Sequence, residues 1–161
     1  MIMDMGTALA ICGAGLAVGL AGTGSGFGVG LVGEIASGVL AEDPNKFGKL
    51  LVLQALPGTQ GIYGLLTGFM VMIKIGVFGG DINAVLVPLE TGLAILFACL
   101  PIAIAGCFTA IAQGRTAAAG VALMAKREEE IGKAITLAAM VETYAVLSLL
   151  ASLLLLNAIQ I

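Results

Sequence analysis

The chain has 161 residues, of which 60% are hydrophobic and only 11% are charged, and its mean hydropathy is +1.13. A soluble domain usually carries about 25% charged residues, and one of this size could not bury so much apolar surface. Disorder is excluded by the same high apolar content, because disordered segments are poor in hydrophobic residues. The balance of 7 Lys+Arg against 10 Asp+Glu offers no basic patch for nucleic acid. We therefore expect an integral membrane protein that binds no nucleic acid.

Long stretches without charge predict an all-α membrane protein with four transmembrane helices. A helix needs about 20 apolar residues to cross a bilayer, and the stretches place four such helices at about 5–40, 46–77, 84–125 and 129–158. Pro44 and Asn45 break the chain between the first two helices, and the charged run 126–130 separates the last two. Gly79, Gly80 and Asp81 separate the two halves.

The positive charges favour one orientation of these helices. Most of them flank the 1–2 and 3–4 connections, and only Lys74 lies near the other side. Because Lys and Arg are enriched on the cytoplasmic side of membrane proteins, we expect a multi-pass protein of the cell membrane. Both hairpin loops would then be cytoplasmic and both termini outside. The residues on the cytoplasmic side are Lys46, Lys49, Arg115, Lys126, Arg127 and Lys133.

The sequence repeats itself at an offset of 84 residues without a gap. The segment Phe47–Lys49 matches Ile131–Lys133, and further identities run through both helices of each half. We interpret the chain as two tandem helical hairpins, residues 1–80 and 81–161. Glu142 aligns with Gly58, so the first hairpin has no carboxylate where the second has one. Both copies have the same direction, which argues against an alternating-access carrier built on an inverted repeat.

The first helix carries a run of alternating glycines. Gly22, Gly26 and Gly30 share one helical face, while Gly24 and Gly28 lie almost opposite. Because small residues let membrane helices approach closely, we expect a helix with a close neighbour on each side, as in a tight inner ring. The second and fourth helices would form an outer, lipid-facing layer. The three cysteines are expected to be small buried packing residues.

Several polar side chains fall at one depth in the membrane. Glu142 lies nine residues past Lys133, roughly 14 Å along a helix, where an unpaired charge costs about 3 kcal/mol. Gln60 and Gln113 fall at a similar depth, and Thr59 adjoins Gln60. Pro57 frees backbone carbonyls in the preceding turn, near Leu53 and Leu56. These groups make an all-oxygen site with one negative charge, which suits a hard monovalent cation.

Three segments carry a resemblance to a known family. The segments 56–63 (Leu-Pro-Gly-Thr-Gln-Gly-Ile-Tyr), 111–114 (Ile-Ala-Gln-Gly) and 138–144 (Ala-Ala-Met-Val-Glu-Thr-Tyr) resemble the proteolipid subunit of V-type ATPases. The similarity covers essentially the whole chain and is greatest to subunit K of bacterial sodium-translocating enzymes. It implies a ring of identical four-helix subunits that forms the membrane rotor and is not catalytic on its own. A bacterial plasma membrane is the location that it implies.

The resemblance also implies roles for individual residues. Glu142 would be the essential carboxylate, and Tyr63 would hydrogen-bond to it and lock the site. The carbonyl of Leu56 and the side chains of three polar residues would complete the shell of a transported Na⁺, with no other cofactor. These three residues are Thr59, Gln60 and Gln113. The implied partners are other copies of the chain, a stator subunit with an essential Arg, central-stalk subunits at the cytoplasmic loops, and membrane lipids.

Three alternatives stay open at the level of sequence. The same rotor could carry H⁺, although two glutamine ligands argue against this because a proton needs only one acceptor. A small four-helix cation-coupled exporter also uses one membrane glutamate, but the gapless repeat and the glycine helix argue against it. A structural pore or membrane scaffold would leave Glu142 unexplained.

One carboxylate per four helices means that fewer ions cross the membrane in each turn of the ring, which favours a pump over a synthase.

Overall fold

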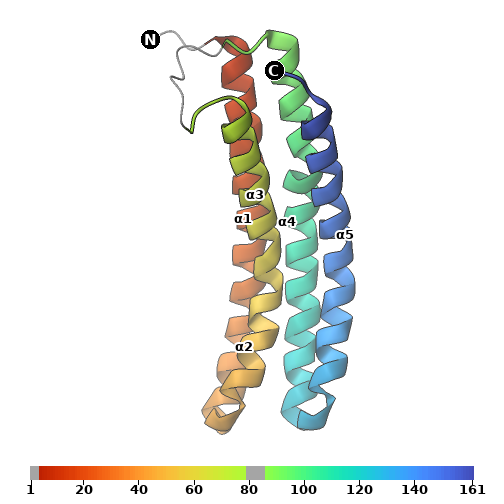
Figure 1. Cartoon of the computed structure of the whole chain (residues 1–161). Coiled ribbons are helices and arrows are strands. Elements are labelled where there is room, and N and C mark those ends of the chain that lie inside the picture. Colours follow the sequence, from red (N-terminus) through yellow and green to blue (C-terminus); the bar gives the residue numbers. More distant parts are fainter. Residues whose placement is uncertain (1–3, 79–85) are drawn as a thin grey trace.

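The computed structural model describes residues 4–78 and 86–161, and in these residues every regular element is a helix. The helices are α1 (Met5–Glu42), α2 (Phe47–Ala55), α3 (Thr59–Lys74), α4 (Leu89–Lys126) and α5 (Ile131–Ala158), with three short 3₁₀ turns at Pro44–Lys46, Leu56–Gly58 and Glu128–Glu130. They form four long rods standing side by side (Figure 1). The predicted link at Gly79–Asp81, the hairpin boundary at 80/81 and part of the expected start of the third helix at 84 lie outside the described residues.

Four stretches are long and apolar enough to cross a membrane: Met5–Glu42, Pro44–Lys74, Leu89–Lys126 and Glu128–Ala158. They agree with the four helices predicted from the uncharged stretches, so the predicted fold class is confirmed. The second stretch differs in one respect, because Pro57 divides it. Proline has no N–H and crowds the preceding turn, and the chain passes from α2 through a 3₁₀ turn into α3 at this point.

The ends of the rods are defined by local chemistry. Asp4 caps α1, because its carboxylate accepts hydrogen bonds from the N–H and the hydroxyl of Thr7, at 2.8 and 2.7 Å. Gly76, with φ of 75°, follows α3 in a conformation that glycine adopts without steric cost. Both hairpin turns lie at one end of the bundle, and α1 begins and α5 ends at the other (Figure 1).

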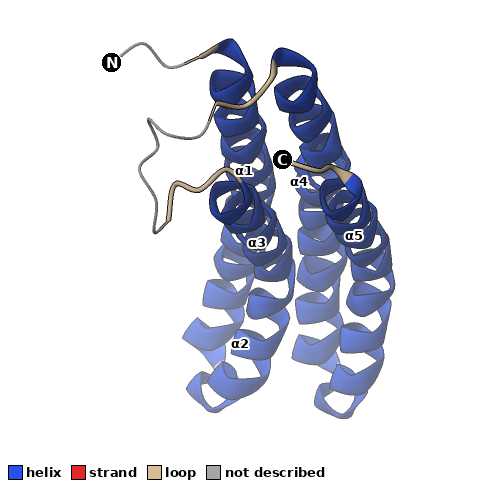
Figure 2. Cartoon of the chain, turned by 45° about the horizontal axis from the view of Figure 1, so that its top comes forward, coloured by secondary structure: helices blue, strands red, loops and turns tan. Residues whose placement is uncertain are grey.

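The rods form two layers. The most extensive packing joins α1 to α4, while α3 packs on α1 and α5 packs on α4. Figure 2 shows α3 and α5 in front of the α1–α4 pair. The outer surfaces of α3 and α5 expose large apolar side chains, as expected for a layer that faces lipid. Examples are Ile62, Leu66, Phe69, Leu147, Leu150 and Leu154.

Glycines allow the close approach of α1 and α4. A Cβ on Gly24 would lie 2.3 Å from the carbonyl oxygen of Cys107, and one on Gly28 would lie 2.5 Å from that of Ala110. The structure therefore gives Gly24 and Gly28 a close neighbour.

The prediction that all three cysteines are buried is wrong for one of them: Cys99 is buried, Cys107 is half-buried and Cys12 is exposed. Cys12 is exposed because it lies on the side of α1 away from α4.

Pro101 lies within the continuous helix α4, and the residue that follows it is tied to a neighbouring helix. The proline ring prevents one regular helical hydrogen bond. The next residue, Ile102, donates its backbone N–H to the hydroxyl of Ser152 on α5, at 3.2 Å. Ser152 is fully buried, so this hydrogen bond ties α5 to α4 within the apolar core.

Candidate ion-binding site

The 3₁₀ turn at Pro57 creates the first part of the site. Thr59, the first residue of α3, hydrogen-bonds back to a backbone carbonyl of this turn. The hydroxyl of Thr59 lies 3.0 Å from the carbonyl oxygen of Leu56 and 3.3 Å from Oε1 of Gln60. Three oxygen atoms from a backbone carbonyl, a hydroxyl and an amide therefore meet at the start of α3.

Two buried amides connect α3 to α4. Gln60 and Gln113 are both fully buried, and Nε2 of Gln60 donates a hydrogen bond to Oε1 of Gln113. A buried amide without partners would be costly, so each glutamine satisfies part of the other's hydrogen-bonding capacity. Their pairing holds two polar side chains at one depth between the two layers.

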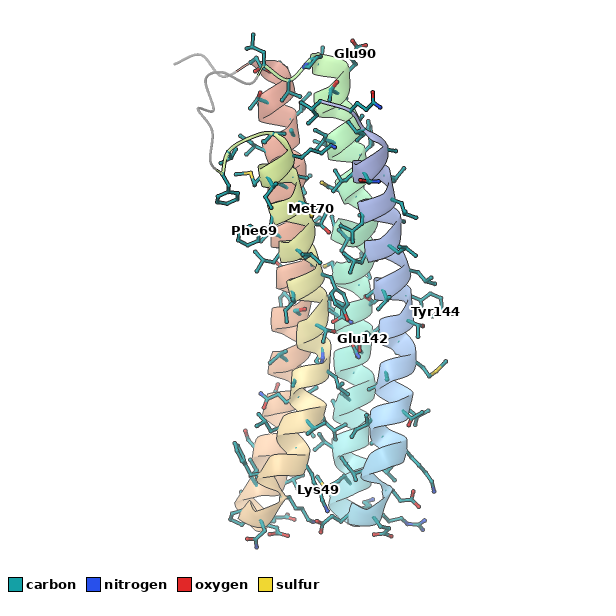
Figure 3. The ribbon with its side chains drawn as sticks, viewed as in Figure 1. Lys49, Phe69, Met70, Glu90, Glu142 and Tyr144 are labelled. Carbon is teal, nitrogen blue, oxygen red and sulfur yellow. The ribbon has the colours of Figure 1, made fainter. Side chains whose placement is uncertain are left out.

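Glu142 of α5 completes the arrangement. Its Oε1 accepts a 2.6 Å hydrogen bond from the hydroxyl of Tyr63, and its Oε2 accepts a 3.4 Å hydrogen bond from Nε2 of Gln113. The carboxylate is half-buried and lies among the helices, whereas Tyr144 points away from them (Figure 3). Tyr144 is 67% exposed, two residues from the glutamate. Within one turn of α5, the carboxylate of Glu142 thus faces the bundle and the ring of Tyr144 faces the surroundings.

These contacts form one continuous network across three helices. It runs from Thr59 through Gln60 and Gln113 to Glu142, and ends at Tyr63. All six residues singled out in the sequence, the carbonyl of Leu56 included, are brought together. Across residues 4–78 and 86–161, every buried side-chain nitrogen and oxygen has a hydrogen-bond partner.

No ion pair of the described residues involves Glu142. Within the described parts of the chain, the ion pairs join Lys46 to Asp43, Lys49 to Glu128 and Lys133 to Glu130, and all lie at the hairpin end. The same parts hold no group of three His, Cys, Asp or Glu side chains that could bind a metal ion. A single carboxylate among neutral oxygen atoms suits a hard monovalent cation and not a soft metal.

Ser25 belongs to this region and was missed by the sequence analysis. It is buried on α1, and its hydroxyl accepts a 2.8 Å hydrogen bond from the backbone N–H of Gly61. This contact fixes the first turn of α3 directly after the break at Pro57. The signal that could have found it is a hydroxyl residue, one of two with Thr23, between the alternating glycines of an apolar helix.

Comparison with known proteins decides the family. The model of the ATP synthase C-subunit family matches residues 12–71 and again residues 96–155. The chain belongs to the C-subunit family of ATP synthases. The second matched segment of this family member begins and ends 84 residues after the first, the same offset as the repeat found in the sequence. The predicted resemblance to rotor-ring proteolipids is confirmed.

Two relatives extend the match over nearly the whole chain of this family member. It is 46% identical over 158 residues to the V-type sodium ATPase subunit K of Enterococcus hirae, and the match spans 98% of this chain and 90% of that protein. It is 41% identical over 148 residues to the A-type ATP synthase subunit K of Methanocaldococcus jannaschii, where the match spans 92% of this chain and 61% of that protein.

Proposed function

We propose that the chain is a rotor-ring subunit of a V-type ATPase that carries Na⁺ across the membrane during ATP-driven rotation. The observation that carries this proposal is the hydrogen-bonded network that includes Glu142, the carboxylate of α5. The similarity to a subunit of a sodium ATPase supports it. The chain itself would have no catalytic role, because ATP hydrolysis would take place in other subunits.

The chemistry of the network favours Na⁺ as the transported ion. Glu142, Gln60, Gln113, Thr59 and the carbonyl of Leu56 offer five oxygen ligands of the kind that hard cations prefer. To bind Na⁺, the two amide groups would have to turn their oxygen atoms toward the ion. They would then give up the hydrogen bonds that the two glutamines make to each other and to Glu142. An H⁺ carrier would need only the carboxylate, so the two buried glutamines would have no function in transport.

Ion occupancy would allow the site to move through lipid. A charged carboxylate in hydrocarbon is unfavourable by about 3 kcal/mol, and a bound Na⁺ neutralises it. The ion would enter from the cytoplasm through a half-channel in the stator and bind at Glu142. Rotation would carry the occupied site around the ring, with the Tyr63 hydroxyl holding the carboxylate in place. An essential Arg of the stator would then displace the ion into the exit path.

The internal repeat suggests how ATP energy is used. We infer two hairpins, residues 1–80 without a carboxylate and residues 81–161 with Glu142. A ring of these chains would then have one site for every four helices. Transporting one charge against 100 mV requires about 2.3 kcal/mol, so fewer ions per turn leave more ATP energy for each ion. This ratio favours a pump that works against a steep gradient.

The hairpin end of the bundle is the surface proposed to bind the central stalk. Lys49 and Glu128 form a 2.6 Å ion pair between the two hairpin turns, and Lys46 donates a 3.3 Å hydrogen bond to the carbonyl of Ala125 at the end of α4. These contacts hold both turns in one rigid end. We propose that this end faces the cytoplasm of a bacterial cell and that both termini lie outside.

The test replaces Glu142 by glutamine in the assembled ATPase complex, reconstituted into lipid vesicles. Glu142→Gln keeps the size of the side chain and removes its charge, so ATP-driven uptake of ²²Na⁺ should be lost while the ring keeps its mass in mild detergent. Glu90→Gln, an exposed acidic residue in the first turn of α4, is the matched control and should transport normally. Retained ²²Na⁺ uptake in Glu142→Gln would refute the proposed role of the carboxylate.

A further inference from the structure

Helix α1 carries none of the five proposed ion ligands, yet it contacts the segment that carries three of them. It packs on the 3₁₀ turn Leu56–Gly58 and on α3. A Cβ on Gly28 would lie 2.7 Å from Cβ of Pro57, and a Cβ on Gly61 would lie 3.3 Å from Cβ of Ser25. The two segments therefore touch on either side of the point where α3 begins.

Ser25 supplies a hydrogen bond in this contact. It is only 6% exposed, and its hydroxyl oxygen accepts the 2.8 Å hydrogen bond from the backbone N–H of Gly61. Gly61 is the third residue of α3, and an N–H in the first turn of a helix has no acceptor within that helix. Ser25 therefore provides an acceptor that the start of α3 lacks.

The residue that precedes α3 cannot provide this acceptor itself. A capping side chain normally belongs to the residue just before the helix, which has an extended backbone. Gly58 occupies that position in this chain. It has no side chain, and its φ of −79° and ψ of −23° are helical. The start of α3 is therefore capped from a different helix, α1.

The same stretch of α1 also holds the helix that carries Gln113. Gly24, directly before Ser25, and Gly28, three residues after it, lie against the backbone of α4. The α4 residue against Gly28 is Ala110, three residues before Gln113. Helix α1 is therefore in direct contact with the chain on both sides of the proposed site, at α3 and at α4.

We propose that Ser25 is a positioning residue that fixes the spacing between the ligands of α3 and Gln113 of α4, and thereby the preference of the site for Na⁺. This inference rests on the proposed function, because it assumes that these ligands bind the ion. Selectivity among hard cations depends on the size and flexibility of the cavity that the ligands form. A start of α3 that is fixed by Ser25 presents Thr59 and Gln60 at one spacing, whereas a free one would adjust to ions of other sizes.

Loss of the hydroxyl should therefore change both the strength and the selectivity of ion binding. In Ser25→Ala the N–H of Gly61 loses its acceptor, so the start of α3 would have to be ordered each time an ion binds. Replacing a capping side chain by alanine corresponds to about a 2- to 30-fold change in an equilibrium constant. We expect the Na⁺ affinity to fall within this range, and the ratio of K⁺ affinity to Na⁺ affinity to rise.

The test measures ²²Na⁺ binding to purified rings, with K⁺ as the competitor. Ser25→Ala should show both changes, whereas Ser25→Thr keeps the hydroxyl and should restore wild-type binding. Ser25→Cys, with a weak sulfur acceptor in place of the oxygen, should change both quantities in the same direction as Ser25→Ala. Ser37→Ala is the matched control on α1, because the exposed Ser37 hydroxyl bonds only to Gly33 of its own helix, at 2.7 Å, and neither quantity should change.

The possible failures can be told apart. If wild-type rings bind no ²²Na⁺, the proposed function itself fails. If wild-type rings bind ²²Na⁺ and Ser25→Ala lowers only their thermal midpoint, with the Na⁺ affinity and the K⁺ to Na⁺ ratio unchanged, Ser25 has a purely structural role. That result would overturn the positioning role of Ser25 and leave the proposed function intact.

Discussion

The hydroxyl of Tyr63 on α3 donates a 2.6 Å hydrogen bond to the carboxylate of Glu142 on α5, across 79 positions of the sequence. The same carboxylate accepts only one other hydrogen bond from a side chain of the described residues, the longer one from Gln113. Tyr63 is therefore the strongest contact that holds Glu142 inside the bundle. This relationship predicts that the phenol controls how firmly the site retains its ion.

Removing the hydroxyl should weaken ion retention without disturbing the fold. A hydrogen bond to a charged group contributes about 1.5–3 kcal/mol, so Tyr63→Phe should lower the apparent Na⁺ affinity of the ring by about 10- to 150-fold. The measurement is ²²Na⁺ binding to purified rings. Tyr144→Phe is the control, since Tyr144 is exposed and should bind normally. Unchanged affinity in Tyr63→Phe would show that the phenol does not lock the site.

The buried amide pair should be important for stability as well as for binding. Gln113→Ala leaves Nε2 of Gln60 buried without its acceptor, which costs about 1–3 kcal/mol. We expect a lower thermal midpoint of the ring in detergent, together with weaker Na⁺ binding. The exposed end of the chain supplies a control in Gln160→Ala, which should change neither quantity. A ring with unchanged stability and affinity would contradict the proposed role of Gln113.

Much of this site could be predicted from the sequence, because the polar residues are rare in apolar helices. Glu142, Gln60 and Gln113 are conspicuous for that reason, and the depth of each along its helix placed them together. The resemblance implied the contact between Tyr63 and Glu142, but the contacts of the two glutamines could not be predicted, since they depend on how α3, α4 and α5 rotate about their axes. Ser25 was missed because its partner is a backbone N–H, which leaves no trace in the sequence.

The fold was predictable to a similar extent and for a similar reason. Uncharged stretches define the spans, and alternating glycines define two faces of α1. The sequence alone did not show which face packs inside the chain. The structure assigns Gly24 and Gly28 to the internal contact, and leaves Gly22 and Gly26 open. Cys12 was expected to be buried because it lies in an apolar helix. It is exposed because it lies toward the open side of that helix.

The two glycine faces should respond differently to an added methyl group. In Gly24→Ala the new Cβ would lie 2.3 Å from a backbone oxygen of Cys107, which cannot move away unless α1 and α4 separate. We expect a loss of about 1–3 kcal/mol in stability, measured by thermal unfolding in detergent. Gly38→Ala on the same helix has open space around it and should be neutral, or more stable by up to about 1 kcal/mol. Equal effects at both positions would contradict the tight contact.

The rate at which a hydrophobic carbodiimide modifies Glu142 shows whether this carboxylate binds Na⁺. The reagent reacts with a free, protonated carboxyl group, so a bound Na⁺ should protect it. We expect millimolar Na⁺ to slow the modification of Glu142 in intact rings, while choline at the same concentration does not. A rate that is independent of Na⁺ and changes only with pH would contradict Na⁺ binding and indicate a rotor that carries H⁺.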